Sequence, residues 1–207
     1  MKINYIKNVR EDKRLSMNEY VDNLISYQKI HFKNLDINEH SINTSKIYKF
    51  LPKKWKLRFA RYIHYPFSLR RLPIFDLTHV VDHSYAHLVK KIKSKIKILT
   101  VNDLIPLVFE KKKLKDMYNP TGEGTDKNLK YLFRYSAKHF KYFDRIIAIS
   151  ENTKKDILKF SDCDESKISV IHTNVTPPYF NNSPINKNEI CLRYNIPVNK
   201  KKILISG

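Results

Sequence analysis

Short apolar runs alternate along the chain with longer segments in which apolar residues recur every three or four positions. The short runs predict β-strands, because each spans only a few residues between polar ones; they cover residues 2–8, 77–81, 97–101, 145–150 and 168–171. In the fourth run, residues 146–149 are continuously apolar rather than alternating. This pattern is typical of a strand that is covered on both faces.

The longer segments predict amphipathic helices. Residues 16–29 place apolar side chains on one stripe, at Met17, Tyr20, Val21, Leu24 and Ile25. A second helix is expected at 125–142, with its inward face formed by Leu129, Leu132, Phe133, Ser136 and Phe140. A third begins after Ser150, which can cap it, and Glu151 lies in its first turn. Strands alternating with helices predict an α/β fold, a doubly wound (Rossmann-like) parallel sheet.

Polar residues follow three of the predicted strands directly. They are Asp82, His83 and Ser84 after the strand ending at 81, Asn102 and Asp103 after 101, and Ser150, Glu151 and Asn152 after 149. Ligands of open α/β sheets bind outside the carboxyl ends of the strands. We therefore expect these side chains to lie along one crevice.

The composition changes beyond residue 175. Residues 177–184 are rich in Pro, Asn and Ser, which disfavours a regular element. We expect a first domain at 1–180, a linker at 181–201 that holds a short helical piece at roughly 187–194, and an apolar strand at 202–207. A lone strand has no partner to pair with, so we expect it to open a second domain that this chain lacks.

Five segments resemble the N-terminal half of family 4 glycosyltransferases, which have the two-domain GT-B fold. In chain order they are residues 75–88 (FDLTHVVDHSYAHL), 97–106 (KILTVNDLIP), 143–157 (FDRIIAISENTKKDI), 167–180 (KISVI…PYF) and 193–207 (RYNIP…KILISG). Two departures from the family pattern stand out. Asn102 occupies the place of a histidine found in many relatives, and residues 16–20 replace a glycine-rich turn that lets the backbone approach an anion.

The resemblance implies a hexosyltransferase-type glycosyltransferase. It would transfer a sugar from a nucleotide-diphosphate donor to an acceptor hydroxyl, usually with retained anomeric configuration, in cell-surface polysaccharide or glycolipid synthesis. The nucleotide sugar is a co-substrate, and neither a cofactor nor a metal ion is expected. The first domain forms the acceptor side, whereas the donor-binding groups lie in the second domain, at whose edge Gly207 stands. The chain alone is therefore expected to be inactive.

Within the predicted crevice, His83 is the catalytic candidate, because an imidazole at this edge can exchange a proton or hydrogen bond with the reacting sugar. Substrate-binding roles are assigned to Asp82, Ser84, Asn102, Asp103, Ser150 and Asn152. Structural roles compete with several of these: Asp103 can cap the next helix, and Ser150 can act only as an N-cap. His79, inside its strand, is expected to be buried.

Charge and cysteine content narrow the cellular setting. Lys and Arg number 40 against 20 Asp and Glu, a formal net charge of +20, which attracts anionic partners or reflects solvated lysines. The 2 Cys are far apart, which favours a reducing cytoplasm over a disulfide framework. The N-terminus has no apolar signal core, and no apolar run reaches membrane-spanning length. We expect a cytoplasmic protein, peripheral on the inner membrane face at most.

Residues 53–64 combine aromatic and cationic side chains at helical spacing. The aromatic positions include Trp55, Phe59 and Tyr62, and the cationic positions include Lys54, Arg58 and Arg61. Such a helix can lie in an anionic membrane surface, or it can pack on the domain as an ordinary amphipathic helix. The alternative function is a non-catalytic basic α/β domain that binds a membrane surface or nucleic acid. Nucleic acid is disfavoured, because no zinc-finger spacing or RNP-like aromatic run is present.

Overall fold

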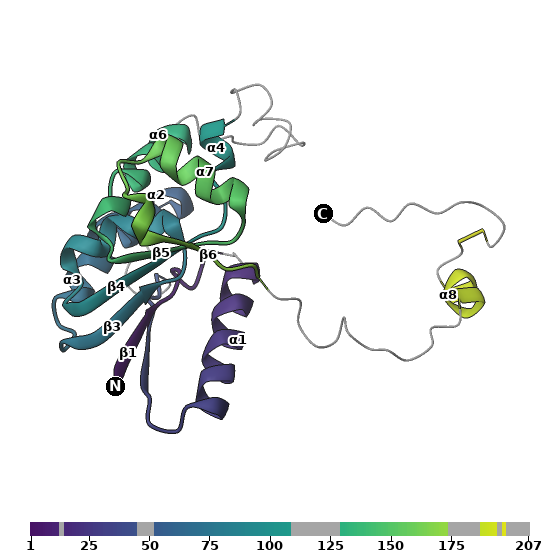
Figure 1. The fold of residues 1–207 in the computed structure, drawn as a ribbon, viewed down its shortest axis with the longest axis horizontal. Coiled ribbons are helices and arrows are strands. Elements are labelled where there is room, and N and C mark those ends of the chain that lie inside the picture. Colours follow the sequence, from purple (N-terminus) through teal and green to yellow (C-terminus); the bar gives the residue numbers. More distant parts are fainter. Residues whose placement is uncertain (13–14, 45–51, 109–128, 174–186, 194–195, 198–207) are drawn as a thin grey trace. The chain divides into compact units, whose positions relative to one another are not determined.

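Six parallel strands form the centre of the structure, a computed structural model that describes residues 1–12, 15–44, 52–108, 129–173, 187–193 and 196–197. The strands are β1 (Lys2–Ile6), β2 (Asp36–His40), β3 (Phe75–Val80), β4 (Ser94–Val101), β5 (Arg145–Ala148) and β6 (Ile168–Val170). Their order across the sheet is β2-β1-β3-β4-β5-β6 (Figure 1). The chain thus moves outward from β1 to β2, then returns to the other side of β1 and continues to β6.

The sheet carries apolar residues on both faces. One row crosses it from strand to strand through directly paired and buried residues: Ile6, Val80, Leu99, Ile146 and Ile168. The adjacent positions, such as Tyr5 and His79, are also paired and buried, and they point to the opposite face because successive residues of a strand alternate. Both faces must therefore be covered by helices.

Helix α1 (Leu15–His31) covers one face of the sheet (Figure 1). Its Val21 and Ile25 form a buried cluster with Ile3, Tyr5 and Val81. The other face carries the elements α2 (Lys53–Phe59), η1 (Ala60–His64), α3 (Tyr65–Leu69), η2 (His83–Lys91), α4 (Ile105–Val108), α6 (Leu129–Ala137), η3 (Phe140–Tyr142) and α7 (Glu151–Phe160). A short turn, η4 (Glu165–Lys167), leads into β6. The fold is the doubly wound, Rossmann-like sheet that the sequence predicts.

Three elements differ from the sequence prediction. Strand β2 was not expected, because its residues are mostly polar; it pairs only with β1, at the edge of the sheet, where one side of a strand needs no partner. The helix expected at 53–64 continues to Leu69, with a π-helical turn at η1. The helix expected at 125–142 is described from Leu129 and ends at Ala137, before the separate 3-10 turn η3.

The chain divides into two compact units, residues 1–172 and 173–207. Within the second unit the structure describes helix α8 (Lys187–Arg193). This helix confirms the helical piece expected at roughly 187–194 inside the linker, and the strand expected at 202–207 lies outside the described residues. Across the described residues, no helix has the length and apolar character needed to cross a membrane.

Candidate functional site

The strand order reverses direction between β1 and β3, and the carboxyl ends of all six strands lie at the same edge of the sheet. In doubly wound sheets this switch point is where ligands bind. The segments that follow β1 and β3, residues 7–12 and 81–84, therefore form the centre of the candidate site. The segments after β4 and β5 lie on one side of it, because these strands come next in the sheet.

Asp82 joins the two central segments. Its carboxylate accepts hydrogen bonds from the Asn8 side-chain amide at 2.9 Å and from the Ser84 backbone N–H at 2.8 Å, and the residue is 1% exposed. The second of these bonds caps the N-terminus of η2. Asp82 is predicted to bind substrate. In the structure its carboxylate holds together the two loops that follow β1 and β3.

His83 occupies the predicted place at the carboxyl edge, but its ring is enclosed. The residue is 3% exposed, and the ring packs edge-on against Phe133 of α6 with 5.2 Å between ring centroids. Its Nδ1 atom lies 3.9 Å from a carboxylate oxygen of Asp82. The structure therefore gives His83 a packing role, and its catalytic role stays a prediction.

A buried ion pair lies next to these residues and was not predicted. The Arg61 guanidinium lies 2.5 Å from the Asp12 carboxylate, donates to the Ser84 hydroxyl at 3.3 Å, and stacks over the Tyr85 ring at 4.3 Å from the centroid. Burial opposes the charge, but Tyr85, Asp12 and Asp82 outweigh it and raise the pKa of Arg61 above its ordinary value. No sequence pattern could pair Arg61 with Asp12, because 49 positions separate them.

This pair corrects the assignment of Arg61 to a cationic, membrane-facing surface. Its side chain is 14% exposed and points into the domain, where Asp12 neutralises it. Tyr62 is also drawn inward: its ring lies 4.7 Å from that of His87, and burial raises its pKa. By contrast, Trp55 is 60% exposed and Phe59 is 37% exposed. Arg58 is half-buried, and the side chain of Lys54 lies outside the described residues.

Asn102 and Asp103 follow β4, and both are partly exposed. The Asn102 amide contacts the Met17 sulfur at 2.7 Å, so it links the β4 edge to the start of α1. Asp103 accepts a hydrogen bond from the Ile105 backbone N–H at 3.2 Å. This bond at the start of α4 is the capping role that the sequence predicts as the alternative to substrate binding.

Ser150 and Asn152 mark the N-terminus of α7, beside the end of β5. The Ser150 hydroxyl accepts a hydrogen bond from the Thr153 backbone N–H at 3.1 Å, which confirms the expected N-cap. Asn152 is exposed in the first turn. Thr153 in turn donates to the Asn102 backbone carbonyl at 3.0 Å, so the β4 and β5 segments are held together. The predicted donor-side residue Gly207 lies outside the described residues.

Two solved structures share this fold. One is the lipopolysaccharide outer core galactosyltransferase WaaB in its apo form, with 13% identity, a TM-score of 0.53, and coverage of 85% of this chain and 46% of that one. The other is HepE from Anabaena in complex with UDP-glucose, with 12% identity, a TM-score of 0.50, and coverage of 94% and 50%. This chain thus spans about half the length of each. No curated protein is similar in sequence at a significant level.

The sequence also matches a family model. The model of Glycosyltransferase Family 4 covers residues 29–177, which include five of the six strands and every predicted site residue of the first unit. That match spans well over half of the 207 residues. The chain therefore belongs to glycosyltransferase family 4.

Proposed function

We propose that this chain is the acceptor-side half of an enzyme that transfers a hexosyl group from a nucleoside-diphosphate sugar to an acceptor hydroxyl. The observation that carries the proposal is the family match over a sheet whose polar residues gather at the switch-point edge. The UDP-glucose bound by HepE supports a nucleotide sugar as co-substrate, and the galactosyltransferase WaaB supports a cell-surface glycolipid or polysaccharide as acceptor.

The proposed reaction consists of three changes. The acceptor hydroxyl forms a bond to the anomeric carbon, the bond from that carbon to the diphosphate breaks, and the hydroxyl proton is lost. Asn102 and Asp103, which are partly exposed, and Asn152, which is exposed, supply amide and carboxylate groups that can hold acceptor hydroxyls at this edge. The diphosphate contacts are expected from a second, donor-binding half, because the family places them there.

Measurements of donor binding test whether the donor site lies outside this chain, in the second half. Calorimetric titration of this chain with a panel of uridine and guanosine diphosphate sugars should show no micromolar affinity. The protein that carries both halves should bind one of these donors and release the nucleoside diphosphate when acceptor is supplied. Micromolar binding by this chain alone would place the donor site in this half. Failure of the two-half protein to release nucleotide from any donor would reject the transferase.

His83 is tested in the two-half protein with two substitutions that separate chemistry from packing. His83→Phe keeps an aromatic ring against Phe133 but removes both nitrogens, whereas His83→Ala removes the ring as well. A proton-transfer role predicts that both variants lose about 100-fold or more in kcat, with His83→Phe still fully folded. Wild-type turnover by His83→Phe would restrict His83 to packing.

A further inference from the structure

A stripe of exposed apolar side chains runs along the helical segment 53–69. Trp55 is 60% exposed, Phe59 37%, Ile63 48% and Phe67 59%. They recur every four residues, a spacing that drifts slowly around an α-helix. The π-helical turn η1 has fewer degrees of rotation per residue and so offsets this drift in the middle of the segment. The four side chains therefore stay on one side of the helix.

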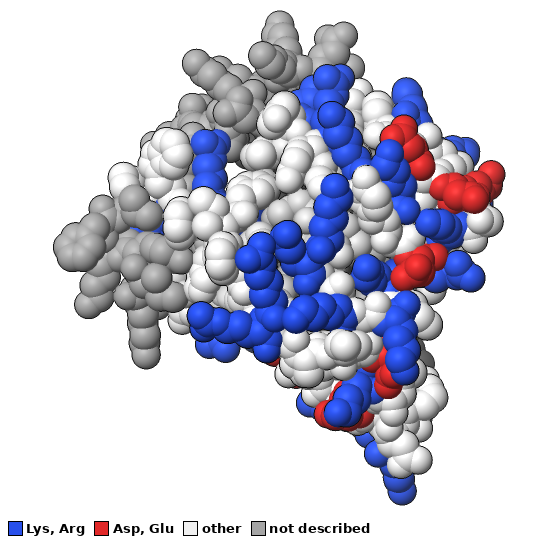
Figure 2. All heavy atoms as spheres, turned by 90° about the vertical axis from the view of Figure 1, so that its left-hand side faces the viewer, with Lys and Arg blue, Asp and Glu red and all other residues white. Residues whose placement is uncertain are grey.

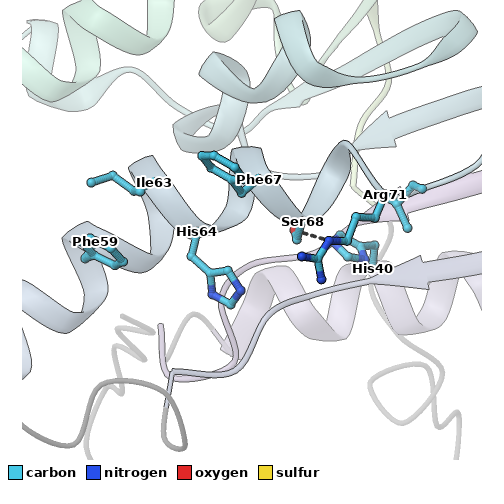
Figure 3. A pocket seen from close by; sticks show the side chains of 8 residues that line it. His40, Phe59, Ile63, His64, Phe67, Ser68 and Arg71 are labelled. Atoms are coloured by element: carbon cyan, nitrogen blue, oxygen red, sulfur yellow. Dashed lines mark hydrogen bonds between the residues drawn. The ribbon is translucent and has the colours of Figure 1, made fainter.

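A groove opens beside the stripe (Figure 3). Its volume is about 540 Å³, and its lining includes Phe59, Ile63, Phe67 and Leu72 as apolar members and His40, His64, Ser68 and Arg71 as polar ones. The polar groups are not spread evenly. Figure 3 shows Arg71, Ser68 and His40 together at one end, where the His40 ring lies 2.9 Å from the Ser68 hydroxyl, whereas His64 lies between this end and Phe59. The groove thus has a polar end and a mostly apolar length that His64 interrupts.

The polar end is cationic because of Arg71. Burial and the neighbouring His64 lower the pKa of His40, so this imidazole is neutral at neutral pH. Arg70, the preceding residue, stacks its guanidinium over the Phe67 ring at 4.7 Å, so a second exposed cation adjoins the stripe. Among the ion pairs of the described residues, none involves Arg70 or Arg71. Figure 2 shows the side of the molecule where α3 lies, on which Lys and Arg far outnumber Asp and Glu.

We propose that the stripe and groove bind the surface of an anionic phospholipid bilayer. Trp55, Phe59, Ile63 and Phe67 enter the headgroup level, an acyl chain lies along the groove, and Arg71 contacts a lipid phosphate. Aromatic side chains rimmed by cations on a chain of net charge +20 match the amphiphilic and anionic character of this surface. The inference rests on exposure and charge, and it is independent of the proposed transferase activity.

Trp55 is the one tryptophan of the chain, so its fluorescence reports on this surface alone. The experiment mixes the chain with vesicles of phosphatidylcholine, with and without phosphatidylglycerol. The emission should shift to the blue with the anionic vesicles, brominated lipid should quench it, and added salt should reverse both effects. Absence of binding at low salt, or binding with unshifted emission, would overturn the proposal.

Matched substitutions locate the contact. Phe67→Ser and Ile63→Ser keep the Trp55 reporter and should weaken vesicle affinity about tenfold, whereas Arg71→Gln should weaken it about fivefold. Ile30→Ser and Phe32→Ser serve as controls, because both residues are exposed apolar side chains outside the stripe. Ile30 (71% exposed) lies in the last turn of α1, and Phe32 (55% exposed) directly follows this helix. Equal losses in the controls and in the stripe variants would assign binding to general charge and hydrophobicity and reject the site. Circular dichroism checks that each variant is folded.

Discussion

His79, His83 and His87 lie within nine positions of one another, yet each has different neighbours. His79 points to the α1 face and lies 2.7 Å from the Thr100 hydroxyl, and burial lowers its pKa to about 4. His87 lies with Nε2 3.1 Å from the Arg61 carbonyl, and burial lowers its pKa, also to about 4. These two side chains are therefore neutral structural groups at neutral pH, whereas His83 packs against α6.

The two low pKa values predict acid sensitivity of the fold. An unfolded histidine titrates near pH 6.5, so between about pH 6.5 and 4 the unfolded chain binds protons that the folded chain does not. The stability is fully present above about pH 6.5 and is lost as the pH falls toward 4. Each histidine contributes at most about 1.4 kcal/mol per pH unit. Urea unfolding at a series of pH values across this window measures the slope.

The substitutions His79→Gln and His87→Gln identify the source of that slope. Each removes one titrating group, so each should flatten the dependence of the unfolding free energy on pH, even if it lowers the stability at neutral pH. If the double variant retains the full slope, other groups are responsible for the acid sensitivity.

Among the secondary structure elements, the segment from α2 to α3 departs furthest from its local sequence signals. Pro66 favours a helix end, since it has no backbone N–H to donate, yet the helical path continues through it into α3. Tyr65 is fully buried, and its hydroxyl lies 2.5 Å from the Lys7 carbonyl and 2.8 Å from the His40 carbonyl. These contacts fasten the helix to the ends of β1 and β2, directly before the proline.

The Arg61–Asp12 pair is the second anchor of this segment. Arg61→Met removes the charge and leaves Asp12 and Ser84 without the guanidinium, so we expect a destabilisation of about 3 kcal/mol, or roughly 6–12 °C in Tm. A double-mutant cycle with Asp12→Asn should show strong coupling between the two sites. Thermal denaturation measures both quantities.

The exposed pair of Lys95 and Asp76 provides the control, since it has a similar distance of 2.8 Å without the burial. Lys95→Met should leave Tm almost unchanged. Equal effects of the two substitutions would mean that the Arg61 pair contributes no more than a surface contact.

At the level of the entire chain, residues 1–172 form a unit that contains all six strands and both described core clusters. We therefore expect a chain truncated after His172 to unfold cooperatively, with a Tm within a few degrees of that of residues 1–207. Calorimetric unfolding of the two proteins tests this. A large loss of Tm, or a broad transition in the shorter chain, would show that residues 173–207 stabilise the sheet.

Local pattern was enough to predict the strands β1, β3, β4, β5 and β6, the parallel sheet and the edge at which polar residues gather. These features follow from side-chain periodicity and from the caps at Asp103 and Ser150, whose partners lie within three positions. The family resemblance added two expectations, a companion half and the reaction class. The local pattern depends on residues that are near one another in sequence, and the family resemblance depends on motifs that occur in a fixed order along the chain.

Contacts between distant segments decided the rest. The burial of His83 depends on Phe133, the inward turn of Arg61 depends on Asp12, and strand β2 depends on pairing with β1. The exposure of Phe67 likewise follows from the continuation of the helix past Pro66, which Tyr65 secures through β1 and β2. Periodicity states which face of an element is apolar, but whether a given side chain meets solvent depends on which remote segment packs against it.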